Sequence, residues 1–171
     1  MMTQKLGLLN YVAADQALHD DLLKLLTLTE TDMTIFYRKL ANIPTQKDYT
    51  DQQLLAELQE AYYQTEPLSE AVTSATLAWL QRYIARARED KCSDQDRKQR
   101  MNAVNPKYII RNYLAQLAID KAEQGDNSMV NELLEVLRHP YDEQPAHQAW
   151  AEKRPDWART KAGCSMLSCS S

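Results

Sequence analysis

Glycine is scarce in this chain, and its scarcity limits the possible folds more than any other feature of the sequence. Only three of the 171 residues are glycine, namely Gly7, Gly125 and Gly163, where average usage would give about twelve. Glycine adopts positive φ at little cost, so a chain with few glycines forms few tight hairpins and few phosphate-binding loops. The sequence has neither the G-x-G-x-x-G nor the G-x-x-x-x-G-K-[ST] pattern of nucleotide-binding enzymes. With one phenylalanine and sparse β-branched runs, the composition favours an all-α fold.

Length and charge exclude further classes of protein. The 171 residues fit one domain or part of one. There are 20 basic and 24 acidic residues, so the chain lacks the surplus of Lys and Arg that nucleic-acid binding requires. No apolar run is long enough for a membrane helix or a secretory signal peptide. We therefore expect a cytoplasmic protein that binds neither nucleic acid nor membrane and keeps its three cysteines reduced.

Apolar residues recur at helical spacing up to about residue 138, which predicts six to eight helices joined by short loops. Thr50 and Gln53 have the spacing of a capping box, and Gly125 is a natural residue to end a helix. The predicted helix starts carry capping residues or prolines, and they lie at Asp15, Thr31 or Asp32, Thr50, Pro67 and Ser69, Ser93, Asn105–Pro106, and Asp126–Ser128. The helix after Pro106 would bury Ile110, Tyr113, Leu114 and Leu117, and the last helix Val130, Leu133, Leu134 and Leu137.

The segment after residue 138 differs from the rest of the chain. Residues 139–171 contain three prolines and two tryptophans and have no sustained period, although a short helix over Ala146–Lys153 is expected. A segment of this kind cannot form a hydrophobic core alone. We therefore predict a helical domain over residues 1–138 and an extended arm over residues 139–171. The arm packs either on the helices or on a body outside this chain.

The histidines do not predict a catalytic or metal site. His19, His139 and His147 lack the spacing of metal ligands. We expect His19 at the surface and His139 at a helix C-terminus, where its charge would interact with the helix dipole. A zinc site formed by the three cysteines and one histidine would need an unrecognised fold. We predict no catalytic, cofactor-binding or metal-ligating residue in this chain.

A run of basic residues could hold a phosphate or an acidic partner. It comprises Arg82, Arg86, Arg88, Lys91, Arg97, Lys98 and Arg100. Four acidic residues are interleaved with it, namely Glu89, Asp90, Asp94 and Asp96. This mixture of charges favours a solvated helix surface whose charges pair with one another.

Cys169 is the most informative single residue, because it lies third from the end of the chain. A thiol near a chain terminus can reach a distant partner and exchange disulfides with it. Two other interpretations stay open, an unimportant terminal thiol and a disulfide between Cys164 and Cys169. A small redox protein acting through these two cysteines is disfavoured, because C-x₄-C is not the C-x-x-C motif of thioredoxin-like sites.

Four segments of the chain follow the patterns of one known family. Asn105–Gln116 is similar to N-P-x-x-[IVL]-[IL]-R-N-x-L-A-Q, and Leu133–Tyr141 to a leucine-rich helix ending in R-x-P-[FY]. Arg154–Trp157 resembles R-P-P-x-W with one proline missing. Ser168–Ser171 resembles a C-terminus in which animal members carry selenocysteine third from the end and many bacterial members carry cysteine. Together they resemble the selenoprotein O family, protein adenylyltransferases with a kinase-like fold.

Lys5–Leu8 and Thr34–Leu40 also resemble the family, so the resemblance covers nearly the whole chain, but only the C-terminal third or so of a family member. It implies an intact enzyme that transfers AMP from ATP to Ser, Thr or Tyr hydroxyls of protein substrates with Mg²⁺ or Mn²⁺. The family's Lys–Glu pair, glycine-containing loop and metal-binding Asn and Asp lie upstream of this region.

None of those catalytic roles falls on a residue of this sequence. We therefore expect the chain to be inactive alone, to buttress an N-terminal kinase-like core, and to bring Cys169 near that core for a redox-responsive disulfide. The alternative is a free-standing helical protein-interaction module without catalytic activity.

Overall fold

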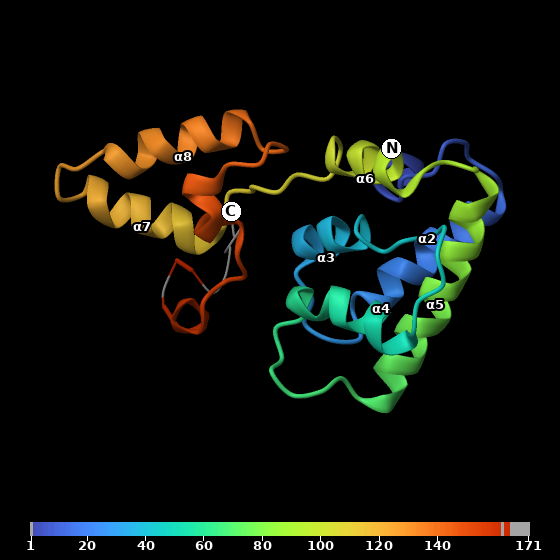
Figure 1. The fold of residues 1–171 in the computed structure, drawn as a ribbon. Coiled ribbons are helices and arrows are strands. Elements are labelled where there is room, and N and C mark those ends of the chain that lie inside the picture. The colour runs from blue at the N-terminus through green and yellow to red at the C-terminus, as the bar shows by residue number, and fades with distance from the viewer. Residues whose placement is uncertain (1, 162, 165–171) are drawn as a thin grey trace. The chain divides into compact units, whose positions relative to one another are not determined.

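The computed structural model describes residues 2–161, 163 and 164, and over these residues the fold is all-α, as predicted (Figure 1). An isolated β-bridge pairs Thr31 with Tyr62, and no strand occurs in the described part of the chain. The α-helices of this part are α1 (Met2–Lys5), α2 (Ala14–Leu25), α3 (Met33–Leu40), α4 (Asp51–Leu58), α5 (Glu70–Glu89), α6 (Asp94–Asn102), α7 (Asn112–Ala122) and α8 (Ser128–Arg138). Three short 3-10 helices are η1 (Gln59–Ala61), η2 (Pro145–Ala151) and η3 (Asp156–Arg159).

The chain divides into two compact units, which we call unit 1 (Met1–Asn105) and unit 2 (Pro106–Ser171). The hydrophobic cluster of unit 1 runs from Leu6 to Met101, and the two clusters of unit 2 lie between Tyr108 and Cys164. The sequence predicts a boundary after residue 138. The structure places it at Asn105, because α7 and α8 share their core with residues that follow Arg138.

The core of unit 1 is built around α5, which packs against α2 and α4 (Figure 1). Trp79 of α5 is 2% exposed, stacks on Tyr83 with ring centroids 5.3 Å apart, and donates its indole N–H to the carbonyl oxygen of Leu18 at 2.8 Å. Apolar side chains of this size each contribute about 1.5–3 kcal/mol when fully buried. The helices around α5 contribute the fully buried leucines Leu22, Leu40 and Leu58.

Side-chain caps start four helices of unit 1 where the sequence predicts them. Asp32, Thr50, Ser69 and Ser93 each accept a hydrogen bond from the backbone N–H three residues further along. At Thr50 the capping box is complete, because the Gln53 side chain accepts from the Thr50 backbone N–H at 3.0 Å. Each such cap stabilises its helix by about 1 kcal/mol.

Two predicted helix starts are wrong. Asp15 is not an N-cap but lies in the first turn of α2, where its side chain is buried and paired with Arg86. The chain after Pro106 stays non-helical up to Arg111, and α7 begins at Asn112. The reason lies in tertiary pairing, because the N–H groups of Lys107 and Tyr108 both donate to the carbonyl oxygen of Pro140.

The described part of the C-terminal arm packs on α7 and α8 within unit 2. Trp157 meets the ring of Tyr113 edge-on at 6.0 Å, and Lys161 forms an ion pair with Asp120. Ala158 and Cys164 are 0% and 1% exposed. The described residues of the arm therefore pack on helices of this chain, which is the first of the two predicted alternatives. The short helix expected over Ala146–Lys153 occurs as η2.

The buried side of α8 is rotated from the predicted one. Leu133 is buried as expected, but Met129 and Val136 are buried in addition. Val130 and Leu134 are 44% and 50% exposed. The apolar stripe of α8 is therefore wider than the surface that α7 and the arm cover.

Candidate functional site

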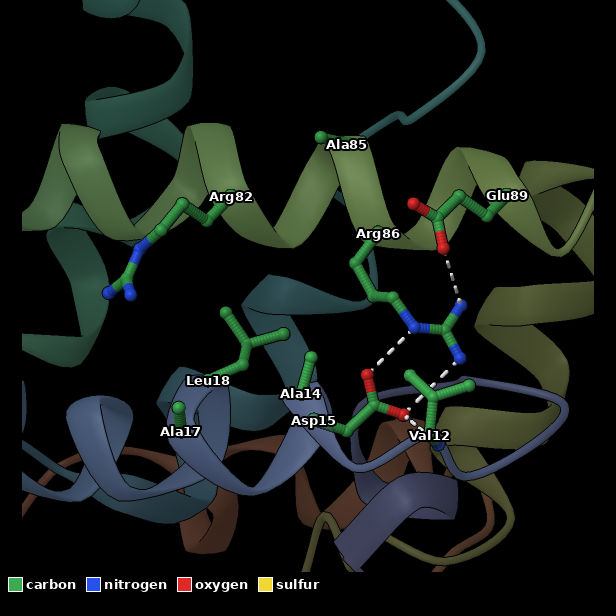
Figure 2. A pocket seen from close by; sticks show the side chains of 9 residues that line it. All are labelled: Val12, Ala14, Asp15, Ala17, Leu18, Arg82, Ala85, Arg86 and Glu89. Carbon is green, nitrogen blue, oxygen red and sulfur yellow. Dashed lines mark hydrogen bonds and ion pairs between the residues drawn. The ribbon is translucent and has the colours of Figure 1, made fainter.

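A hollow on the described surface of unit 1 lies between α2 and α5 (Figure 2). Its volume is about 410 Å³, and small side chains of both helices form much of its lining, namely Ala14, Ala17 and Ala85. Charged residues surround them, with Arg82, Arg86 and Glu89 contributed by α5 and Asp15 by α2. Helical spacing explains this arrangement, because positions three and four apart share one side of α5.

A nearly buried ion-pair network lies at one end of this hollow. The Arg86 guanidinium reaches from α5 to α2 and donates to both carboxylate oxygens of Asp15, at 2.7 and 3.2 Å (Figure 2). It also donates to Asp90 at 3.0 Å. The three side chains are only 10%, 5% and 9% exposed. The hydrogen bond to Asp15 raises the pKa of Arg86, burial opposes the rise, and the hydrogen bond to Asp90 adds to it.

The same network binds the backbone of the segment Leu9–Val12. Asp90 accepts from the Leu9 N–H at 2.7 Å, and Asp15 accepts from the Val12 N–H at 3.0 Å. Arg86 donates to the Asn10 carbonyl oxygen at 2.8 Å. Three residues of this segment, Leu9, Tyr11 and Val12, are nevertheless 50%, 59% and 42% exposed.

A second buried arginine, Arg97 of α6, is 2% exposed. It donates to the Tyr83 hydroxyl at 2.7 Å and to the backbone carbonyl oxygen of Ile43. Burial raises the pKa of Tyr83, so its hydroxyl stays protonated and donates to the carbonyl oxygen of Leu6 at 2.9 Å. Arg97 and Tyr83 together therefore join four segments of unit 1, and the cation is not available to an external phosphate.

The remaining arginines of the basic run are also paired within unit 1. Arg82 pairs with Asp21 at 2.9 Å, and Arg88 with Asp48 at 3.2 Å. Arg100 donates to the Cys92 sulfur at 3.1 Å. The prediction that the basic run pairs with its own interleaved acids is therefore wrong for these three arginines, because none of these partners is one of those acids.

The histidines lie in three separate places. His19 was expected at the surface, but its side chain is only 14% exposed, and its Nε2 has no hydrogen-bond partner among the described residues. His139 is exposed just after α8, with its Nδ1 3.6 Å from Asp142. The His147 ring lies against the Trp150 ring at a tilt of 39°, with centroids 5.0 Å apart. These positions bring no two histidines into one site.

The two cysteines that the structure describes belong to different units. Cys92 is half-buried in unit 1 and Cys164 is buried in unit 2, and both are free thiols. Cys169 lies outside the described residues, so its redox role and its pairing with Cys164 stay predictions.

The described residues do not fit a Mg²⁺ or Mn²⁺ site. Over residues 2–161, 163 and 164, no three His, Cys, Asp or Glu side chains are grouped closely enough to hold a metal. The buried carboxylates Asp15 and Asp90 already accept hydrogen bonds from Arg86 and from the backbone. The same residues include no helix with the length and hydropathy to cross a bilayer.

Sequence reasoning missed the Asp15–Arg86–Asp90 network. Arg86 and Asp90 are four residues apart on one helix, which is a visible pairing signal. Asp15, however, is 71 residues from Arg86, and nothing in the local sequence of either residue indicates the other.

The chain is similar to known proteins over its whole length. A family model described as "Protein adenylyltransferase SelO" matches residues 1–138. Two curated relatives are named "Protein nucleotidyltransferase YdiU". The relative from Rhodopirellula baltica is 53% identical to this chain. The match covers 100% of this chain and 33% of the relative. The one from Flavobacterium johnsoniae is 48% identical, with 100% of this chain and 32% of the relative covered. The chain thus spans about a third of the length of these relatives.

Proposed function

Because the chain belongs to the SelO family of protein adenylyltransferases and corresponds to a C-terminal portion of its members, we propose that it buttresses the catalytic core of such an enzyme. The intact enzyme would transfer AMP from ATP to Ser, Thr or Tyr hydroxyls of protein substrates. The observation that carries this proposal is 53% identity over the entire chain to a nucleotidyltransferase three times as long.

The chemistry of the described side chains favours a structural role for this chain over a catalytic one. The cations Arg86 and Arg97 donate hydrogen bonds to acceptors of the protein, and each links several segments of unit 1. ATP and its Mg²⁺ or Mn²⁺ would then be bound by the part of the enzyme that this chain does not span. The AMP acceptor would be a separate protein.

The free-standing interaction module is the competing proposal, and the apolar surface distinguishes the two. A portion that docks on a larger body exposes more apolar surface than a monomer normally does. Large exposed apolar side chains occur in both units, including Leu9, Tyr11, Val130 and Leu134. A contiguous apolar patch larger than about 600 Å² on the isolated chain would favour docking on a larger body.

The test is a chimera in which this chain replaces the matching third of the Rhodopirellula baltica relative. The assay is incorporation of the labelled α-phosphate of ATP into protein. We expect the chimera to label protein, the chain alone to label none, and the relative's remaining two-thirds alone to be less active or less stable than the chimera. Micromolar binding of ATP·Mg²⁺ to the chain alone, measured by calorimetry, would contradict the proposal. Full activity of the remaining two-thirds alone would exclude buttressing.

The proposal also includes a redox role for Cys169. In a cytoplasmic enzyme thiols are kept reduced, so their oxidation can act as a signal. A disulfide between Cys169 and a core cysteine would form when both thiols lose their protons and two electrons to a cellular disulfide such as oxidised glutathione. We expect Cys169→Ser in the chimera to abolish any difference in activity between oxidised and reduced enzyme. An unchanged difference would refute the switch.

A further inference from the structure

The segment Leu9–Val12 combines a fixed backbone with an exposed apolar surface. Leu9, Tyr11 and Val12 are between 42% and 59% exposed, although they are close neighbours in sequence. Val12 also lines the hollow between α2 and α5. The three side chains and the hollow therefore belong to one part of the surface of unit 1, which we call the Leu9–Val12 surface.

The backbone of this segment is held by groups that are themselves nearly buried. The Leu9 N–H, the Asn10 carbonyl and the Val12 N–H bind Asp90, Arg86 and Asp15 respectively. Those three side chains are at most 10% exposed, although their hydrogen bonds to Leu9 and Asn10 lie at the solvent-exposed surface. The backbone of the segment is therefore hydrogen-bonded to the Asp15–Arg86–Asp90 network, while Leu9, Tyr11 and Val12 stay exposed.

Stability of unit 1 alone does not account for this arrangement. Taking charged groups out of water is costly, and a buried ion pair often contributes nothing net to stability. Exposed leucine, tyrosine and valine forgo the burial that stabilises a fold. A binding surface benefits from both features, because apolar anchors held in place before binding lose little entropy when a partner covers them.

The chemistry of the hollow selects the kind of partner. Its charged lining comprises two arginines, Arg82 and Arg86, and two acids, Asp15 and Glu89, so its formal charges cancel. A highly charged ligand such as a nucleic acid gains nothing from a neutral lining. Alanines at positions 14, 17 and 85 leave room for protein backbone to approach closely. The surface therefore fits an apolar protein surface.

We propose that the Leu9–Val12 surface binds the two-thirds of the enzyme that this chain does not span. The inference rests on the proposed function and names the contact through which buttressing occurs. In the relatives that contain those two-thirds, they belong to the same polypeptide as the matched third. A covalently linked partner acts at an effective concentration of about millimolar, so it outcompetes a second copy of the chain for the same surface.

The test compares thiol accessibility in the isolated chain and in the chimera with the Rhodopirellula baltica relative. Tyr11→Cys reports on the surface, because the Tyr11 side chain is 59% exposed. Leu28→Cys, at a position 54% exposed in the same unit, and Leu134→Cys, at a position 50% exposed in unit 2, are the comparison variants. Labelling is read by mass spectrometry of the peptide that carries each substitution, on samples that sediment as single species.

We expect the Tyr11→Cys variant to react at least about tenfold more slowly in the chimera than in the isolated chain. An equal rate at that position, with protection at either comparison position, would overturn this inference and leave the proposed function standing. Equal rates at all three positions would count against both. A rate in the isolated chain that falls as its concentration rises would identify a second copy as the occupant and also overturn the inference.

Discussion

Single residues of unit 1 act here through tertiary contacts that their neighbours in sequence do not reveal. Gly7 has a φ of +71°, which non-glycine residues rarely adopt. A Cβ at this position would lie 2.7 Å from Cγ atoms of both Arg97 and Met101 in α6. Gly125 has a similar φ of +86°, but a Cβ there would meet nothing within 4 Å. A side chain would therefore be strained at both positions, but only at Gly7 would it also collide with neighbouring atoms.

Replacing these glycines by alanine should give unequal losses of stability. Gly125→Ala should lower the free energy of unfolding by about 1 kcal/mol, from backbone strain alone. Gly7→Ala should lower it by about 2–4 kcal/mol, because α6 must also shift. Urea denaturation followed by circular dichroism measures both. Equal losses would mean that α6 accommodates the methyl group freely.

Asp94 shows how a loop is fixed by one carboxylate. It accepts hydrogen bonds from the Thr45 N–H and hydroxyl, both at 2.8 Å, and from the Gln46 N–H at 3.3 Å. Burial acts to raise the pKa of Asp94, but these hydrogen bonds outweigh it and hold the pKa below its ordinary value of 3.8. The carboxylate therefore stabilises the fold at neutral pH, and protonation in acid removes that contribution.

The stability difference between wild type and Asp94→Asn should depend on pH. Because the pKa is depressed in the folded state, the difference should be fully present above pH 3.8 and should shrink as the pH falls through the lower folded value. Thr45→Val, which removes one of the donors, should show a smaller change of the same sign. Urea midpoints between pH 2.5 and pH 7 measure this. A difference that does not change with pH would refute the role of the carboxylate.

At the scale of elements, η3 attaches the described part of the arm to α7. The Lys161–Asp120 ion pair lowers the pKa of Asp120 and raises that of Lys161, but both groups are solvated, so the pair contributes little stability. The apolar contacts matter more, because Ala158 is fully buried and Trp157 packs on Tyr113. Cys164 is buried in the same cluster.

A charge at position 158 should release the arm and expose Cys164. Ala158→Glu places a carboxylate where the wild-type side chain is 0% exposed, at a cost of several kcal/mol if the arm stayed in place. The Cys164 thiol should then react with a maleimide at least about tenfold faster. The control is Arg159→Ala, which alters the neighbouring residue. Because the Arg159 side chain is partly exposed, this substitution should change the rate little. An unaltered rate in Ala158→Glu would show that η3 does not shield the thiol.

At the scale of the whole molecule, the chain has two units with separate cores. The cluster of unit 1 draws its described members from residues 6–101, and those of unit 2 from residues 108–164. The last helix of unit 1, α6, supplies Arg97 and Met101 to the first of these cores. Unit 1 therefore has all the residues that its core requires.

A chain ending at Asn105 should fold by itself. Its thermal unfolding midpoint should lie within about 5 °C of the corresponding transition in the full chain, because no member of its core is lost. A chain ending at Cys92 lacks α6 and should lose cooperative unfolding. Circular dichroism measures both. An unfolded 1–105 chain would show that the division into units does not reflect independent stability.

The spacing of residues in the sequence was sufficient to predict features that depend on a single helix. The caps at Asp32, Thr50, Ser69 and Ser93 are local, since donor and acceptor are three residues apart. The all-α class follows from the same local periodicity, and the family from matched segments. The candidate site was not predictable in this way, because Arg86 finds Asp15 only when α2 and α5 pack together.

By itself, then, the sequence determined which segments are helical, where most of them start, and which family the chain belongs to. Only the tertiary structure decided that Pro106 begins an extended segment, that the described part of the arm packs on α7 and α8, and that Asp15 is buried against Arg86. The physical reason is distance along the chain. Helix caps and periodicity act over three or four residues, whereas burial and ion pairing depend on residues that are far apart in sequence and become neighbours only on folding.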